Sequence, residues 1–339
     1  MENLSDNADS SLPALKEPAL KYALDNQLPL FPEKALHKGE IFEVEGSDNG
    51  LSEPQVLYKH PKGAIYTGDS FKWLSSLENE SVDLIIADPP YNIKKAEWDS
   101  FESQQAYVQW SLNWIEQAAR VLSSKGTLYV CGFSEILADI KLPALRFFEG
   151  CRWLIWHYKN KANLHSDWGR SHESILHFRK SKKFTFNTDD VRVPYGNHTT
   201  KYPERTQAET SQYGGSNPRK KQVWRPHPRG AKPRDVIEIP TTCNGMHETT
   251  PHPTQKPEEF FRKLVLASSN EGDLVIDPFL GSGTTAVVAE QLKRNWMGCD
   301  LSKEYCQWAI ERIELARDWP IEKWIEFDLA NVNRRKSIR

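Results

Sequence analysis

The sequence lacks several features that would assign a protein to a familiar class at once. No apolar run approaches the roughly 20 residues of a membrane-spanning helix, and the first residues do not combine a basic start with an apolar stretch. We therefore expect a soluble, cytoplasmic protein with no membrane partner. The five cysteines show no C-x-x-C spacing, which favours a reduced intracellular chain.

Metal-ligand spacing and a strong net charge are also missing. The stretch HETTPHP (247–253) holds two histidines without an evident partner set, so no bound metal is expected. The net charge of −2 gives no overall basic signature. Between Arg179 and Asp235, however, fourteen Lys or Arg stand against five Asp or Glu. This basic block indicates a face that binds a polyanion, with an ordinary solvated loop as the alternative.

Apolar runs alternate with segments of helical spacing along most of the chain. The run SVDLIIADPP (81–90) is typical of a strand buried on both faces of a parallel sheet. A helix is expected over 100–126 with Gly126 as its C-terminal cap, and Pro143 should interrupt a helix over 134–150. The pattern predicts an α/β fold with a doubly wound, mostly parallel sheet. A strand running into a turn is expected at 64–70, further strands at 127–132, 151–159, 173–180, 236–240, 273–279 and 295–300, and further helices at 71–78, 256–269, 281–294 and 302–317.

Changes in composition divide the chain into five parts. Residues 1–55 are polar and predict a loosely ordered arm with a short helix near 13–25. Two α/β halves, 56–180 and 236–320, flank the irregular basic segment 181–235, and residues 321–339 form a C-terminal tail. This arrangement predicts one sheet-containing domain with an insertion.

The stretch ADPPYN (87–92) follows the buried strand with an acid and two prolines. Two prolines cannot continue a ladder of strand hydrogen bonds. They restrict the backbone and remove two N–H donors, so that neighbouring carbonyls and side chains point in set directions. This pattern favours a rigid active-site wall over a flexible surface loop.

The stretch VIDPFLGSGTT (275–285) reads as a strand ending in Asp277, a glycine-rich turn and a helix. Glycines let backbone approach a ligand, and the helix start offers free N–H groups. Asp300 ends the next strand, where an acid can accept hydrogen bonds from ribose hydroxyls. Because the spacing is not G-x-G-x-x-G, the pattern favours a ribose ligand without a required pyrophosphate. Glycines that serve only packing are the alternative.

Together, ADPPY (87–91) and DPFLGSGTT (277–285) resemble the DNA amino-methyltransferases that use S-adenosylmethionine and modify exocyclic nitrogens of adenine or cytosine. The order, with DPPY first, the basic block next and FLGSG last, resembles the β class of these enzymes. GD (68–69) and HPTQKP (252–257) also match, and the resemblance covers roughly residues 62–317. It implies a Rossmann-like methyltransferase fold with a catalytic half at 56–180, a target-recognition insertion at 181–235 and a cofactor-binding half at 236–320.

The resemblance assigns the proline turn to the target base. An exocyclic amino nitrogen is a poor nucleophile because its lone pair is delocalised into the ring. Asp88 would accept one amino N–H and the Pro89 carbonyl the other, which favours a tetrahedral nitrogen, while Pro90 stiffens the turn. Tyr91 would stack on the base. Because the base must leave the duplex to reach such a pocket, base flipping is implied.

The same resemblance implies a set of cofactor-binding residues. Thr254 and Lys256 would help bind the methionine end, Asp300 the ribose and Asp69 the adenine. The alternative role for Asp69 and Lys256 is structural, as a helix cap or a surface charge. The residues implied around the methionine and adenosine are Asp277, Phe279, Gly281, Ser282, Gly283 and Thr284, with Asp88 also bordering the cofactor.

In the basic block, arginines and lysines can neutralise phosphates, and the arginines are also the type that reads guanine edges. The candidates for DNA contact are Arg219, Lys220, Lys221, Arg225, Arg229 and Arg234. The segment 160–173 is expected to form a loop near the active site. Double-stranded DNA is the expected partner, and the resemblance allows a homodimer and a cognate restriction endonuclease.

The leading hypothesis is a site-specific DNA adenine-N6 methyltransferase, because the four-residue motif begins with Asp88. Cytosine-N4 methylation is the alternative within the same chemistry. RNA or protein-glutamine methylation is a further alternative, although the basic block favours nucleic acid. A catalytically silent DNA-binding protein and a nicotinamide dehydrogenase are less well supported, since DPPY is intact and G-x-G-x-x-G is missing.

Overall fold

The computed structural model describes residues 39–43, 53–93, 99–158, 168–206, 223–242, 246 and 248–318. The expected short helix near 13–25 and the tail 321–339 lie outside the described residues. Within the described part of the chain, no helix is long and apolar enough to span a membrane.

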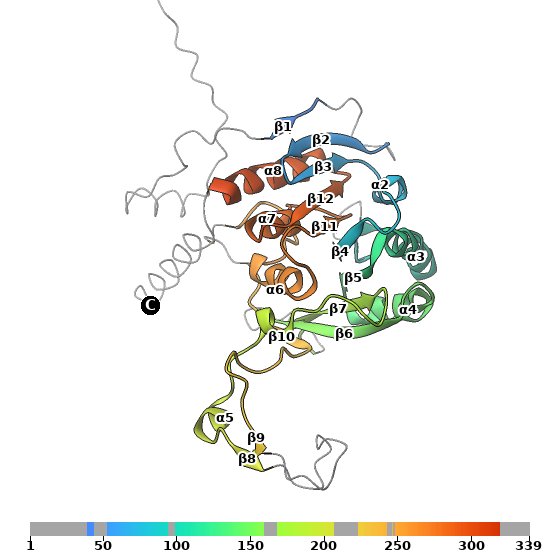
Figure 1. Ribbon diagram of the computed structural model, residues 1–339. Helices are drawn as coiled ribbons and strands as arrows, with labels where there is room; N and C mark the ends of the chain where they lie inside the picture. The colour runs from blue at the N-terminus through green and yellow to red at the C-terminus, as the bar shows by residue number, and fades with distance from the viewer. Residues whose placement is uncertain are drawn as a thin grey trace, which may run out of the picture.

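One large sheet runs through the described residues (Figure 1). Its strands are β1 (Glu40–Ile41), β2 (Gln55–His60), β3 (Gly63–Thr67), β4 (Val82–Ala87), β5 (Leu122–Gly132), β6 (Gly150–His157), β7 (His172–Arg179), β10 (Val236–Glu238), β11 (Leu274–Asp277) and β12 (Asn295–Asp300). Their order is β1-β2-β3-β12-β11-β4-β5-β7-β6-β10. The strands β3, β12, β11, β4 and β5 are mutually parallel, which confirms the predicted mostly parallel sheet. Antiparallel pairing occurs on both sides of this centre, where β2 joins β3 and β7 lies between β5 and β6.

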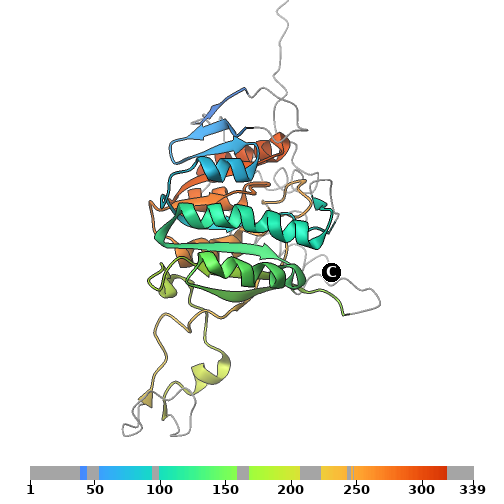
Figure 2. The same ribbon diagram turned by 90° about the vertical axis from the view of Figure 1, so that its right-hand side faces the viewer.

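Helices cover both faces of the sheet, as a doubly wound fold requires (Figures 1 and 2). One face carries α2 (Ser70–Ser76), α3 (Gln104–Val121) and α4 (Ser134–Ala144), and the other carries α6 (Glu258–Ser268), α7 (Thr284–Gln291) and α8 (Lys303–Asp318). Each face has its own apolar core, with Ile115 in one and Phe260 in the other. The central strand β4 contributes Leu84 to one core and Ile85 to the other, so the uninterrupted apolar run reflects burial on both faces.

Local sequence signals explain where the helices begin. The Asp69 carboxylate accepts a 2.9 Å hydrogen bond from the Lys72 N–H and caps α2, which confirms the helix-cap role considered for this residue. The Ser103 hydroxyl caps α3 in the same way through the Ala106 N–H. Pro257 precedes the first residue of α6, where its missing N–H costs nothing.

The expected C-terminal cap at Gly126 is wrong. Helix α3 ends at Val121, and β5 already begins at Leu122. Gly126 lies inside β5, where an added Cβ would meet a Leu122 side-chain carbon at 2.8 Å and the Asp83 carbonyl oxygen at 3.1 Å. Its lack of a side chain therefore serves a close approach to β4, not a helix end. Pro143 behaves as expected, because α4 ends one residue later and passes into a 3-10 turn over Leu145–Phe147.

Part of the basic segment projects from the body of the molecule (Figures 1 and 2). The projection carries α5 (Asn197–Lys201) and the paired strands β8 (Arg205–Thr206) and β9 (Val223–Trp224). Earlier in the basic segment, the Asn187 side chain donates to the carbonyl of Leu266 in α6 and to that of Ser269, which directly follows α6. The functional division at residues 181 and 235 remains a prediction.

Candidate active site

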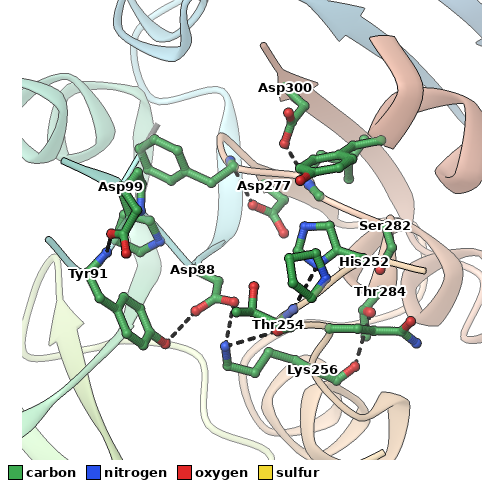
Figure 3. A pocket seen from close by; sticks show the side chains of 18 of the residues that line it. Asp88, Tyr91, Asp99, His252, Thr254, Lys256, Asp277, Ser282, Thr284 and Asp300 are labelled. Carbon is green, nitrogen blue, oxygen red and sulfur yellow. Dashed lines mark hydrogen bonds and ion pairs between the residues drawn. The ribbon is translucent and has the colours of Figure 1, made fainter. Parts of the chain in front are cut away.

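Three acids from distant parts of the sequence meet at one edge of the sheet. Asp88 directly follows β4, Asp277 ends β11 and Asp300 ends β12. Because β4, β11 and β12 are adjacent and parallel, their carboxyl ends lie side by side. All three acids line one cavity of about 870 Å³, a volume suited to a small organic ligand (Figure 3).

The DPPY turn forms one wall of this cavity. Asp88, Pro89, Pro90 and Tyr91 all line it. The Pro90 carbonyl accepts a 2.6 Å hydrogen bond from the Tyr107 hydroxyl of α3. This contact fixes the direction of a peptide group that has no strand partner.

Asp99, which the sequence analysis missed, holds the residues after the prolines. Its carboxylate accepts hydrogen bonds from the N–H groups of Tyr91 and Asn92 at 2.6 Å each and from Ile93 at 3.2 Å (Figure 3). Asp99 is only 1% exposed. A turn that leaves the sheet frees several N–H groups, so an acceptor was to be expected, but no sequence pattern singled out Asp99.

The Asp88 carboxylate has two polar partners. One oxygen accepts from the Tyr91 hydroxyl and the other from the Lys256 ammonium, each at 2.6 Å (Figure 3). Glu173 of β7 also approaches both donors, at 3.0 Å from the Tyr91 oxygen and 3.5 Å from the Lys256 nitrogen. Sequence reasoning missed Glu173, because nothing in β7 indicates that its side chain reaches the DPPY turn.

The charges of this cluster follow from its burial. Burial by itself lowers the pKa of Lys256, but Asp88 and Glu173 outweigh that effect, so the pKa lies above its ordinary value and the ammonium persists. Burial and the same two carboxylates raise the pKa of Tyr91 well above its ordinary range, so its hydroxyl remains a donor. The rings of Tyr91 and Phe133 pack edge to face, with their centroids 5.0 Å apart. Stacking of Tyr91 on a target base stays a prediction.

The glycine-rich turn and the start of α7 donate hydrogen bonds to Asp277 and Asp300, the two acids on their side of the cavity. The Phe279 N–H and the Thr285 hydroxyl donate to Asp277, at 2.9 and 2.5 Å. The Gly281 N–H donates to Asp300 at 2.7 Å. Burial raises the pKa of Asp277 to about 7 and that of Asp300 to about 6, although these hydrogen bonds act in the opposite direction.

Most of the residues predicted to bind a cofactor line the cavity. They are Asp69, Asp88, Thr254, Lys256, Asp277, Phe279, Gly281, Ser282, Thr284 and Asp300. Gly283 is not among the lining residues. It adopts φ 81°, and an added Cβ would lie 2.6 Å from the Ala309 Cβ, so it allows α7 to pack closely on α8. A direct cofactor contact from Gly283 stays a prediction.

Aromatic side chains complete the cavity. Phe279 packs against Trp110 and Trp114 of α3, with ring centroids 5.7 and 5.2 Å apart. Both tryptophans lie within the helix expected over 100–126, but no motif in the sequence indicated that they would reach the cavity. Within the predicted loop 160–173, Arg170 also lines the cavity and places its guanidinium 3.9 Å from the centre of the Phe133 ring. In the described residues, no group of His, Cys, Asp and Glu could hold a metal ion.

Among the predicted DNA-contacting residues that the structure describes, Arg225, Arg229 and Arg234 do not line the cavity. Arg219, Lys220 and Lys221 lie outside the described residues. Arg225, Arg229 and Arg234 are exposed, the first next to β9 and the others after it. Arg225 pairs with Glu204 at 3.0 Å, and Arg229 contacts Asp189 and Asp190 at 3.5 and 3.3 Å.

Comparison with known proteins places this chain in a family. Residues 82–311 match the N6/N4 methyltransferase family model, which is described as DNA methylase. The type II methyltransferase M.HpaI of Haemophilus parainfluenzae is 36% identical over 257 residues, which is 74% of each chain. The DNA adenine methyltransferase YhdJ of Escherichia coli strain K12 is 32% identical over 289 residues, 84% of this chain and 92% of the relative. The PvuII DNA methyltransferase (cytosine-N4-specific) shares the fold, with a TM-score of 0.56 and 19% identity over 78% of this chain and 91% of that chain. The chain therefore belongs to the N6/N4 DNA methylase family and is a DNA methyltransferase.

Proposed function

We propose that the protein transfers a methyl group from S-adenosylmethionine to the exocyclic N6 of adenine, at a specific site in double-stranded DNA. The observation that carries this proposal is that the DPPY turn and the glycine-rich turn open into one cavity, with Asp88 and Asp300 both in its wall. A methyl donor and an amino acceptor can thus meet within one enclosure. Because Asp88 and Pro89 lie in the wall of this cavity, while a base in a duplex is stacked and paired, the target base must rotate out of the duplex to reach them.

The residues on the side of the glycine-rich turn fit the cofactor. Asp69 and Asp300 offer acceptors for adenosine, and the rings of Phe279 and Trp110 offer an apolar surface to a purine. The carboxylates of Asp88, Asp277 and Asp300 suit a cationic ligand. S-adenosylmethionine, when bound, supplies a methyl group on a positively charged sulfur. We assign 236–320 to cofactor binding, 56–180 to catalysis and 181–235 to target recognition.

The residues on the side of the DPPY turn fit the amino group. Asp88 accepts one amino N–H and the Pro89 carbonyl the other, which directs the nitrogen lone pair towards the methyl group. As the nitrogen gains the methyl group and positive charge, the Asp88 carboxylate stabilises that charge and takes one N–H proton. These acceptors are kept in place by the hydrogen bond from the Tyr107 hydroxyl to the Pro90 carbonyl and by the backbone N–H groups that donate to the Asp99 carboxylate.

Two observations favour adenine over cytosine as the proposed target base. The motif begins with Asp88, which is more usual in adenine enzymes, and a relative 32% identical over most of its length is named as a DNA adenine methyltransferase. Cytosine-N4 methylation is the second candidate, because the same two acceptors would serve its amino group. A homodimer and a cognate restriction endonuclease remain predictions.

The test uses unmethylated duplex DNA of mixed sequence and S-adenosylmethionine with a labelled methyl group. Mass spectrometry of the digested nucleosides then identifies the labelled base. Label on N6-methyladenine is expected, whereas label on N4-methylcytosine would correct the base. Asp88→Asn should reduce transfer by roughly 100-fold or more, since it removes the charge that stabilises the nitrogen. Glu116→Gln, an exposed change on α3, is the control.

A further inference from the structure

The cluster around Asp88 contains a cation that the proposed chemistry does not need. The Lys256 ammonium lies 2.6 Å from Asp88, and its side chain is only 6% exposed. Glu173 lies 3.5 Å from the same ammonium, and the side chains of Asp88 and Glu173 are each 17% exposed. The three groups together carry one net negative charge, with one cation shared between two carboxylates.

Lys256 opposes the role proposed for Asp88. During methyl transfer the amino nitrogen becomes positive next to the Asp88 carboxylate, and a buried ammonium on that carboxylate repels it. In a poorly screened site, unit charges a few ångströms apart interact strongly enough to change a rate by more than tenfold. Lys256 cannot relieve this repulsion by losing its proton, because its pKa is raised.

Glu173 is placed to compensate for this cation. Its Oε2 atom approaches both donors that bind Asp88, the Lys256 ammonium and the Tyr91 hydroxyl. An amino group that arrives at Asp88 must compete with these donors for the carboxylate oxygens. Glu173 offers both donors a second acceptor, so they can turn away from Asp88 without being left unpaired in a buried site.

We propose that Glu173 is a positioning residue for methyl transfer, which takes up the Lys256 ammonium and the Tyr91 hydroxyl so that the Asp88 carboxylate can stabilise the reacting nitrogen. This inference rests on the proposed function, but it does not depend on whether the base is adenine or cytosine. It assigns a role to a side chain from β7, a strand that contains none of the recognised motifs.

The first test is Glu173→Gln, which keeps the size of the side chain and removes its charge. The rate of methyl transfer is measured in a single turnover with cofactor and DNA saturating, and cofactor affinity is measured separately by calorimetry. We expect the rate to fall roughly tenfold or more, with cofactor affinity within about threefold of wild type. A rate equal to wild type, or a loss explained entirely by cofactor affinity, would overturn the proposal.

The second test separates charge compensation from simple structural support. In Glu173→Gln combined with Lys256→Gln, the surplus cation is removed and Asp88 again gives one net negative charge. The double variant should transfer methyl groups faster than Glu173→Gln alone when the cofactor is saturating. If Glu173 only supports the fold, the second substitution should lower the rate of methyl transfer further. A double variant that is no faster than Glu173→Gln alone would therefore refute the inference.

Ser174→Ala is the matched control, because Ser174 is the next residue of β7 and points to the opposite face of the sheet. Among the described residues its hydroxyl is one of the buried groups without a hydrogen-bond partner, so its loss should leave the rate unchanged. Wild type and Ser174→Ala report on the proposed function, since neither would methylate DNA if that function were wrong. The ratios between the Glu173 variants and wild type report on the inference.

Discussion

The carboxylate of Asp99 accepts a 2.6 Å hydrogen bond from the backbone N–H of Tyr91, and this contact joins two loop segments at the wall of the active site. This hydrogen bond restricts the turn that carries Asp88. The first prediction concerns this contact.

Asp99→Asn should weaken three backbone hydrogen bonds at once, because an amide offers one acceptor oxygen and places a donor against the remaining N–H groups. We expect a loss of about 2–3 kcal/mol in the free energy of unfolding, measured by urea denaturation. Methyl transfer should fall as well, since Asp88 loses its fixed position. Tyr107→Phe, which removes one hydrogen bond to the same turn, should cost about 1 kcal/mol. Equal stability of Asp99→Asn and wild type would contradict this account.

The second prediction uses the burial of Asp277. Its pKa is raised from 3.8 to about 7, so between these pH values the folded state binds more protons than the unfolded state. The contribution of Asp277 to stability is therefore fully present below about pH 4 and is lost as the pH rises to about 7.

Asp277→Asn should remove this dependence. Compared with the variant, the free energy of unfolding of wild type should decline between pH 5 and 7 by up to about 1.4 kcal/mol per pH unit. Urea titrations across this range give both curves, and their difference reports Asp277 together with its electrostatic coupling to Asp88 and Asp300. Curves that stay parallel would show that Asp277 is already ionised in the folded protein.

The third prediction separates backbone conformation from packing at Gly283. Gly283 and Gly272 have similar φ angles, 81° and 84°, but an added Cβ would meet Ala309 at 2.6 Å in the first case and no atom within 4 Å in the second. Gly272→Ala should therefore cost only about 1 kcal/mol, from the left-handed backbone.

Gly283→Ala should cost about 1–3 kcal/mol more, because α7 and α8 must move apart. Thermal unfolding of both variants measures the difference. A similar loss in the two variants would mean that the contact between α7 and α8 adapts easily. Cofactor affinity of Gly283→Ala, measured in parallel, would also test whether this glycine approaches the ligand.

The fourth prediction concerns Arg234, which lies at the end of the basic segment and shortly before β10. Arg234 is exposed, and Arg234→Ala should reduce the slope of log affinity for DNA against log salt by about 1 if the residue contacts a phosphate. Fluorescence anisotropy with duplex DNA at several salt concentrations measures the slope. Lys59→Ala is the control, because Lys59 is exposed on β2, which lies near the opposite end of the strand order from β10. Equal slopes for Arg234→Ala and wild type would exclude Arg234 from the DNA interface.

Local patterns were sufficient for the two motifs and for most elements of the sheet. Asp88 and Asp277 could be identified because buried strands, prolines and glycines impose their conformations over a few residues. The end of α3 was predicted wrongly because that prediction also rested on a local pattern alone. Gly126 has the local signature of a cap, but its actual role depends on the proximity of β4.

The α/β class, the DPPY turn and the glycine-rich turn could be predicted from the sequence, because these depend on periodicity and on backbone chemistry within short segments. The partners of Asp88, the hydrogen bonds to Asp99 and the entry of Glu173 into the site follow from the tertiary structure. Those contacts join residues up to 168 positions apart, as between Asp88 and Lys256. They depend on the order of strands in the sheet and on side-chain directions, which no local pattern encodes.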